Sequence, residues 1–207
     1  MRRLILVLLA FSIFNCKEKT SAVKDATAFA YADVVFIVPP MEVSKKDLVL
    51  NQNEGKWYLH GQPYNGYSVK RYPNGNIEER WGFYKGKREG MARSWSENGV
   101  LRVESYYHRN KLVGVYKTWW ENGAIAEESN YDNGRKQGAE RQWYPTGQLA
   151  KSRQLVDGKE DGLQKAWLQN GKLYVNYEAK DGRIFGMKRA NLCYQLKDEI
   201  VVRDEKL

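Results

Sequence analysis

Tryptophan and a basic residue recur together through the middle of this chain, at a spacing of 24 residues. Each tryptophan follows an Arg or Lys by two positions, and the pairs are Arg93 with Trp95, Lys117 with Trp119, Arg141 with Trp143 and Lys165 with Trp167, with Arg189 continuing the basic series. Residues two apart on a strand point to the same face of a sheet. Such a face can bind an anionic group or a protein partner, because indoles supply flat apolar contact and cations attract negative charge.

This series of residues has two interpretations. Basic side chains on an open strand commonly pair with acidic side chains of the neighbouring strand, and the expected register places Arg93 and Lys117 opposite glutamates. In the later repeats, the same register places Arg141 and Lys165 opposite uncharged residues. The series is therefore either a structural row of charge pairs or a binding face, and the predicted face comprises Arg141, Trp143, Lys165, Trp167 and Arg189.

Residues suited to catalysis or metal binding are sparse. His60 and His108 are separated by two repeats, which is about 19 Å across four strand spacings and too far for shared metal ligation. The chain has no Gly-x-Ser-x-Gly motif, no Cys/His cluster and no phosphate-binding glycine loop. Cys193 is expected to be a buried thiol, with a reactive or metal-binding thiol as the alternative. We predict a protein without catalytic residues, metal, cofactor or small-molecule substrate.

Two series of glycines indicate the elements that position the tryptophans. Both keep the spacing of 24 residues, one at Gly75, Gly99, Gly123, Gly147 and Gly171 and the other at Gly66, Gly90, Gly114, Gly138, Gly162 and Gly186. Four glycines of the first series follow Asn, and Asn-Gly is typical of a two-residue type I′ turn in which both residues have positive φ. The second turn of each repeat is expected to be looser.

The repeat is therefore strand, tight turn, strand, looser turn. It predicts an all-β fold, an elongated single-layer antiparallel β-meander of 24-residue hairpin repeats with short terminal capping elements. Two-residue turns would place Trp120 opposite Ile125, and likewise pair Tyr72 with Ile77, Tyr144 with Leu149 and Leu168 with Leu173.

One repeat reads Tyr84-x-Gly86-x-x-x-Gly90-x-x-x-x-Trp95-x-x-Asn98-Gly99, and this pattern resembles the bacterial variant of the MORN repeat. The resemblance extends over residues 55–187. Proteins of this group are often labelled YwqK-family antitoxins. The resemblance implies a repeat sheet without a catalytic signature, and the label implies an antitoxin or immunity-like inhibitor. The eukaryotic MORN proteins imply a third function, a module that binds acidic phospholipids.

The N-terminus is typical of an exported lipoprotein. Residues 1–15 are predicted to be a signal peptide, with Arg2 and Arg3 ahead of an apolar stretch over residues 4–14. Cys16 follows in the position of a lipobox cysteine, so we predict that it is lipidated and that residues 16–33 form a flexible tether. The alternative is cleavage after the Ala-Thr-Ala at residues 26–28.

The net charge and the predicted export of the chain together restrict the classes of partner that it can bind. The formal net charge of +9 falls to +7 when Arg2 and Arg3 are removed with the signal peptide. A basic chain rich in aromatic residues can bind nucleic acid, but export disfavours that partner. We expect a lipid-anchored, non-enzymatic scaffold of the bacterial cell envelope that binds a protein or an anionic glycan or lipid.

The ends outside the repeats are predicted to protect the edges of the sheet. Residues 34–54 are assigned to N-terminal edge strands, one at 34–38 and one at 48–50. Residues 55–187 are assigned to the MORN-like repeat sheet. Residues 188–207 are assigned to a C-terminal cap, with a helix possible at 196–199.

Overall fold

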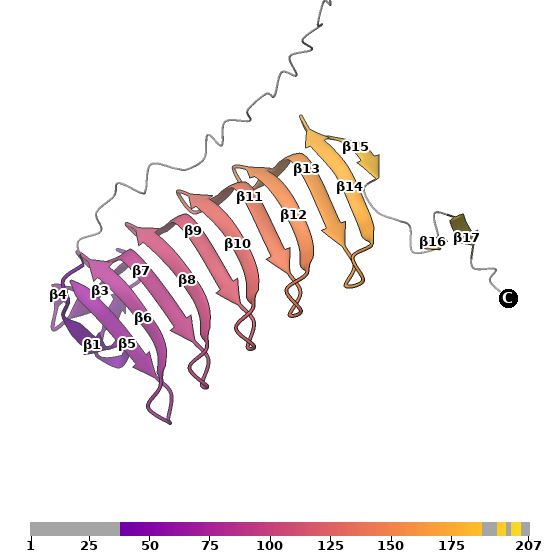
Figure 1. Cartoon of the computed structure of the whole chain (residues 1–207). Coiled ribbons are helices and arrows are strands. Elements are labelled where there is room, and N and C mark those ends of the chain that lie inside the picture. The colour runs from indigo at the N-terminus through magenta and orange to yellow at the C-terminus, as the bar shows by residue number, and fades with distance from the viewer. Residues whose placement is uncertain (1–37, 188–193, 198–199, 204–207) are drawn as a thin grey trace, which may run out of the picture.

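The computed structural model describes residues 38–187, 194–197 and 200–203. The predicted signal peptide and tether, residues 34–37 of the strand predicted at 34–38, Cys16, Arg189 and Cys193 lie outside the described residues. Val38, the described end of that predicted strand, is not in a strand. Most of the described chain forms one 12-stranded sheet, with strand order β1-β5-β6-β7-β8-β9-β10-β11-β12-β13-β14-β15 (Figure 1). The predicted elongated antiparallel meander is confirmed, and one parallel strand is added at its N-terminal edge.

The elements follow the repeat closely. The long sheet comprises β1 (Glu42–Ser44), β5 (Gly66–Arg71), β6 (Ile77–Tyr84), β7 (Lys87–Trp95), β8 (Leu101–His108), β9 (Lys111–Trp119), β10 (Ile125–Asp132), β11 (Arg135–Trp143), β12 (Leu149–Val156), β13 (Lys159–Trp167), β14 (Leu173–Lys180) and β15 (Arg183–Met187). The other elements are the 3₁₀ turn η1 (Lys45–Asp47), a small sheet of β2 (Val49–Asn51), β3 (Lys56–Leu59) and β4 (Gln62–Pro63), and a hairpin of β16 (Tyr194–Lys197) and β17 (Ile200–Arg203).

The two kinds of turn are interchanged relative to the sequence prediction. The turns expected to be looser have two central residues, both with positive φ, as at Arg109 (50°) and Asn110 (71°) between the paired residues His108 and Lys111. This is the type I′ geometry. In the Asn-Gly turns only the glycine has positive φ, and Gly123 has φ 80°. The prediction of type I′ turns at Asn-Gly was wrong.

The asparagine side chains of the Asn-Gly turns form hydrogen bonds, as the turn at Asn122 shows. The Trp120 amide bonds to the Ala124 carbonyl at 2.8 Å, so three residues form the loop and the glycine closes it. Asn122 Oδ1 accepts from the Ala124 amide at 3.1 Å, and its Nδ2 donates to the Pro145 carbonyl of the next repeat at 2.8 Å. One asparagine thus stabilises its own turn and ties it to the following one.

The longer loop shifts the register by one residue beside each turn of the first glycine series. Trp119, and not Trp120, lies opposite Ile125. The other predicted partners, Tyr72, Tyr144 and Leu168, are likewise replaced by the preceding residues Arg71, Trp143 and Trp167. A bulge restores the predicted register in the body of the strands, where Lys117 lies opposite Glu128.

The displaced side chains connect successive repeats. Tyr72 and Tyr144 donate their hydroxyls to the carbonyls of Trp95 and Trp167, at 3.0 and 2.9 Å. Trp120 donates its indole N–H to the Trp143 carbonyl at 2.9 Å. These bonds span 23 residues of sequence, so they hold neighbouring hairpins together where β-ladder bonds end.

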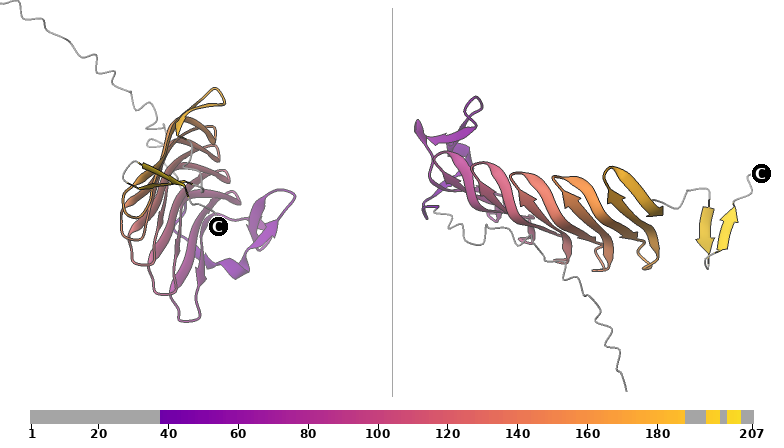
Figure 2. Two further views of the ribbon diagram at one scale, coloured as in Figure 1. Left: turned by 90° about the vertical axis from the view of Figure 1, so that its right-hand side faces the viewer. Right: turned by 90° about the horizontal axis from the view of Figure 1, so that it is seen from above.

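Four glycines of the second series lie at bulges inside the strands, and they are Gly90, Gly114, Gly138 and Gly162. Gly114 has φ 65°, and across it the pairing of β8 with β9 shifts between Glu104–Lys117 and Tyr106–Val113. A residue with a side chain is strained at such a φ, which explains the recurrence of glycine at this position. The regular bulges increase the local twist of the sheet, which is visibly twisted and curved in Figure 2.

A second layer is present at the N-terminal end, where the small sheet lies over one face of the long sheet (Figure 2). Leu48, Tyr64 and Phe83 form its buried core, with Trp57 and Trp81 packed against them. Residues 56–63, assigned from sequence to the repeat sheet, therefore belong to this separate sheet. The strand expected at 48–50 is present as β2, but it pairs with β3, because Leu48 packs onto the sheet face. The edge is covered by β1, which pairs with β5 in parallel.

At the other end, β15 pairs with β14 and has no second partner strand within the described residues. The hairpin β16–β17 forms a sheet of its own, with Leu196 paired to Val201. The helix considered for 196–199 was wrong at residues 196 and 197, which are in β16. Pairing with the β-branched stretch at 200–202 favours the strand.

Candidate functional site

A single row of paired residues crosses the long sheet and contains the basic series. We call it the charged row, and its members from β6 to β14 are Arg80, Arg93, Glu104, Lys117, Glu128, Arg141, Ser152, Lys165 and Asn176. Each member lies directly opposite the next. The row places four members of the basic series on one surface, because strand pairing carries the 24-residue period across the sheet.

The middle of the charged row is compensated by glutamates. Arg93 contacts Glu104 at 2.6 Å, and Lys117 contacts Glu128 at 3.1 Å, as the sequence predicted. Arg141 also contacts Glu128, at 3.8 Å. The expectation that Arg141 lacks an acidic partner was therefore wrong. It considered Ser152 on the following strand, whereas Glu128 lies opposite Arg141 on the preceding strand.

Lys165 is the other cation of this row that was predicted to lie opposite an uncharged residue. It lies between Ser152 and Asn176, and no carboxylate of the described residues is within 4.0 Å of its ammonium group. Glu128 is shared between Lys117 and Arg141, so the positive charge is in excess from Arg141 onward. Arg189, the last member of the predicted face, lies outside the described residues.

The tryptophans of the predicted face stand opposite aliphatic residues at one end of their strands. Trp143 pairs with Leu149 and Trp167 with Leu173, and all four tryptophans of the series are half-buried. Among the described residues, the cations that lie over aromatic rings are not members of the basic series; they are Lys45, Arg80, Lys85, Arg88 and Lys136. Trp143 and Trp167 therefore contribute apolar surface, and Arg141 and Lys165 are not held against them by cation–π contact.

Apolar side chains are exposed beside the unpaired end of the row. Leu163 is 52% exposed and lies two residues before Lys165 on β13. Phe185 is 54% exposed on β15, and Glu178 stands opposite both of them. This surface combines a cation, exposed aliphatic and aromatic groups and one carboxylate. Such a combination is suited to binding a partner through apolar contact and charge.

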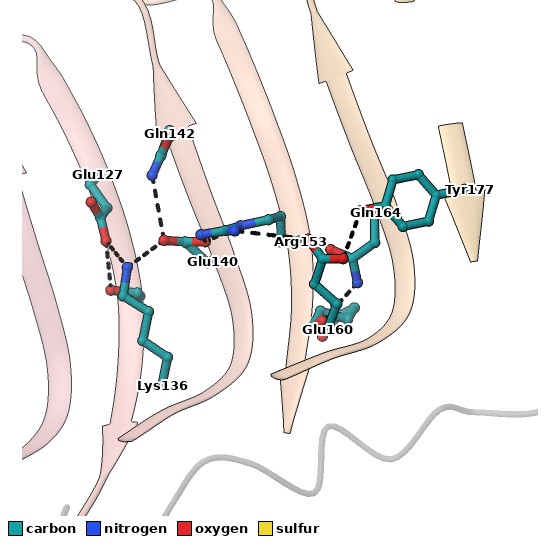
Figure 3. A network of polar contacts seen from close by, with 10 residues as sticks. Glu127, Lys136, Glu140, Gln142, Arg153, Glu160, Gln164 and Tyr177 are labelled. Carbon is teal, nitrogen blue, oxygen red and sulfur yellow. Dashed lines mark hydrogen bonds and ion pairs between the residues drawn. The ribbon is translucent and has the colours of Figure 1, made fainter. Parts of the chain in front are cut away.

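The opposite face contains a buried ion-pair network that the sequence analysis missed (Figure 3). Glu140 is 1% exposed and forms ion pairs with Lys136 and Arg153. Lys136 also contacts Glu127 at 2.6 Å. The signal was present in the sequence, because the predicted register already places Glu140 opposite Arg153.

The protonation states in this network follow from the ion pairs. Burial raises the pKa of Glu140, but hydrogen bonds and the charges of Lys136 and Arg153 outweigh it, and the pKa falls below its ordinary value of 4.5. Burial lowers the pKa of Lys136, but its bonds to Glu127 and Glu140 raise it overall. Burial, together with a 2.7 Å bond to Glu160, raises the pKa of Tyr177 to about 12. Glu140 and Lys136 thus stay charged near neutral pH, which suits a structural role.

The described residues hold no group of three His, Cys, Asp or Glu side chains placed to bind a metal ion. Of the two histidines, His108 contacts the Glu89 carboxylate at 2.8 Å, and His60 occupies a turn with φ 49°. Within the same part of the chain, no helix has the length and apolar character needed to cross a membrane.

Comparison with known families identifies the repeats. A family model described as the MORN repeat variant matches residues 88–109, 112–133 and 136–156. No curated protein matches the chain. MORN repeats generally form non-catalytic scaffolds and often mediate membrane or protein interactions. The matched segments include Arg93, Lys117 and Arg141, whereas Lys165 lies beyond them in a hairpin with the same architecture.

Proposed function

We propose that this protein is a non-enzymatic repeat scaffold of the bacterial envelope that binds an acidic protein or anionic glycan on the open face of its last repeats. The observation that carries the proposal is the change along the charged row. The glutamates of β8 and β10 are replaced by Ser152 and Asn176 in β12 and β14, which leaves Lys165 without an acidic neighbour in the row. Exposed Leu163 and Phe185 beside it supply apolar contact.

The geometry favours binding over catalysis. The face is an open sheet surface, and the charged groups of the row are either paired or, at Lys165, placed between uncharged residues. An open surface binds a partner by shape and charge over several strands, and unpaired charge on it raises the rate of association. The number of repeats then sets the length of partner that the surface can accept.

We further propose that the scaffold is held at a membrane through a lipid on Cys16. The support is the sequence of residues 1–16, a basic start followed by an apolar stretch and a cysteine. The mass of the natively expressed protein tests this proposal, because acylation of Cys16 adds the mass of its fatty acyl chains. Loss of membrane partition in Cys16→Ser supports the anchor, and unmodified protein in the cytosol contradicts it.

The binding face can be tested with a defined heparin oligosaccharide as the anionic probe. We expect Lys165→Glu to weaken binding several-fold. Arg93→Glu is the matched control, because it makes the same charge change in the same row where Glu104 already compensates. Equal losses in the two variants would contradict a face located at the unpaired end.

Acidic phospholipid is the second candidate ligand, favoured by the same excess of positive charge. Vesicles containing phosphatidylglycerol should bind Cys16→Ser protein and lose that binding in Cys16→Ser/Lys165→Glu. Binding to the oligosaccharide without binding to these vesicles would assign the face to a glycan or acidic protein. A role as an antitoxin or immunity-like inhibitor rests on the family resemblance alone.

A further inference from the structure

A cavity of about 920 Å³ lies where the small sheet meets the first type I′ turns of the long sheet. One wall comes from the β3–β4 hairpin and Asn65, and the other from the β6–β7 and β8–β9 turns. This volume is in the range of sites for small molecules. The cavity needs both walls, so it exists only at the end of the repeat array where the second layer is present.

Three cations that line the cavity have no acidic partner for their side chains among the described residues. The side-chain nitrogens of Lys85, Lys87 and Arg109 each lie more than 4.0 Å from every carboxylate oxygen of those residues. Lys85 lies over the ring of Tyr84, 5.3 Å from its centroid. A fourth cation, Lys56, is engaged by Glu54 at 2.8 Å and adds little free charge.

The one carboxylate that lines the cavity has a structural role. Glu89 is 8% exposed, accepts a hydrogen bond from the Arg109 amide at 2.9 Å and contacts His108 at 2.8 Å. In other repeats an uncharged side chain accepts the equivalent hydrogen bond from the turn. Asn65 accepts it from the Lys85 amide, and Gln137 accepts it from the Asp157 amide. Glu89 therefore holds the β8–β9 turn, and the cavity keeps an excess of positive charge.

The repeats themselves show that turn geometry does not explain the basic residues. The first turn position is Lys85 or Arg109 beside the cavity and Asn133, Asp157 or Asp181 in the later repeats, and all five have φ between 48° and 53°. Asn and Asp tolerate this left-handed backbone better than Lys or Arg. The chain thus places cations at the two turns that line a cavity, in a conformation that suits them less well.

We propose that this cavity binds a small organic anion carrying a phosphate or sulfate ester. Lys85, Lys87 and Arg109 would hold the charged group, and the organic part would pack against Tyr84, which is 41% exposed, and Pro63. Three cations favour a phosphate or sulfate group over a lone carboxylate, because its several oxygens accept charge-assisted hydrogen bonds from more than one cation. The site is separate from the charged row and does not depend on the proposed function.

Calorimetry with phenyl phosphate and the full-length protein tests the site. The double variant Lys85→Asp/Arg109→Asn carries residues that later turns of this chain use at the same positions, so it should fold. We expect its affinity for phenyl phosphate to fall at least tenfold. Lys159→Glu is the control, at the position equivalent to Lys87 three repeats away, and it should bind like the parent protein. Lys165→Glu, on the charged row, reports whether the anion binds there instead of in the cavity.

Three results would overturn the proposal. They are the absence of binding to both phenyl phosphate and phenyl sulfate, equal affinity in parent and double variant, and equal weakening by Lys159→Glu. A loss in Lys165→Glu alone would place the anion on the charged row instead. Competition by glycerol phosphate or by phosphatidylglycerol vesicles then separates a free ester from a lipid headgroup, and either result is consistent with the site.

Discussion

The N-terminal end and the later repeats bury their side chains in different ways. At β5–β7 the small sheet supplies a second layer, and Phe83 and Tyr64 are buried in an apolar core. From β10 to β13 the same face is covered by its own polar side chains, with Glu140 buried between Lys136 and Arg153. A single-layer sheet can therefore be stabilised by ion pairs and by bonds between turns, and the other face remains open for binding.

The largest effect should come from the two-layered end. Phe83→Ala removes a side chain that is 1% exposed, and we expect a loss of about 3–5 kcal/mol in unfolding free energy, measured by chemical denaturation. Phe185→Ala, at a residue 54% exposed, should change it by less than about 0.5 kcal/mol. Similar losses of unfolding free energy in the two variants would mean that the buried apolar core stabilises the fold no more than an exposed side chain does.

The second-largest loss of stability should come from the buried ion-pair network around Glu140. Glu140→Gln leaves Lys136 and Arg153 without their shared carboxylate, and because those two side chains are 25% and 29% exposed we expect about 2–3 kcal/mol of destabilisation, below the full buried-pair value. A loss under about 0.5 kcal/mol in denaturant unfolding would show that solvent compensates the cations fully.

The pH dependence of stability gives the same network a second test. The pKa of Glu140 is lower in the folded chain than its ordinary value of 4.5. The contribution of Glu140 to the stability of the folded chain is therefore fully present above about pH 4.5. This contribution is lost as the pH falls through the lower pKa of the folded state. Glu140→Gln should have a shallower decline in stability below pH 4.5. An unchanged acid slope would contradict the ion pairing.

The ties between turns should have a smaller effect. Asn122→Ala removes the hydrogen bonds to the Ala124 amide and the Pro145 carbonyl, and we expect a loss of about 1–2 kcal/mol in thermal or denaturant unfolding. Asn53→Ala, which removes an exposed side chain outside the repeats, is the comparison. Equal effects would mean that the asparagine does not connect the repeats.

The periodic features of the fold could be predicted from the sequence, and the single contacts could not. The 24-residue period predicted the meander and placed Lys117 opposite Glu128. The turn types were interchanged, because Asn-Gly fits both a type I′ turn and a three-residue loop, and the choice here depends on the bond from Asn122 to Pro145 in the next repeat. The small sheet was missed, because the packing of Leu48 on Phe83 has no periodic signal.

The candidate face was predictable in part for the same reason. Its row followed from the period, whereas the partner of Arg141 required both neighbouring strands to be considered, and the contact with Glu128 came from the strand that was left out. The cavity beside Lys85 and Arg109 could not be predicted, because it depends on how the small sheet lies against two turns.

The central claim is that the missing glutamates, and not the cations themselves, make the last repeats a binding face. Asn176→Glu tests it directly, because it places opposite Lys165 the acid that Glu104 and Glu128 supply in earlier repeats, and it leaves every cation in place. Affinity for the heparin oligosaccharide should fall several-fold in this variant and rise in Glu128→Asn, which removes the acid shared by Lys117 and Arg141. Unchanged affinity in both variants would contradict the claim.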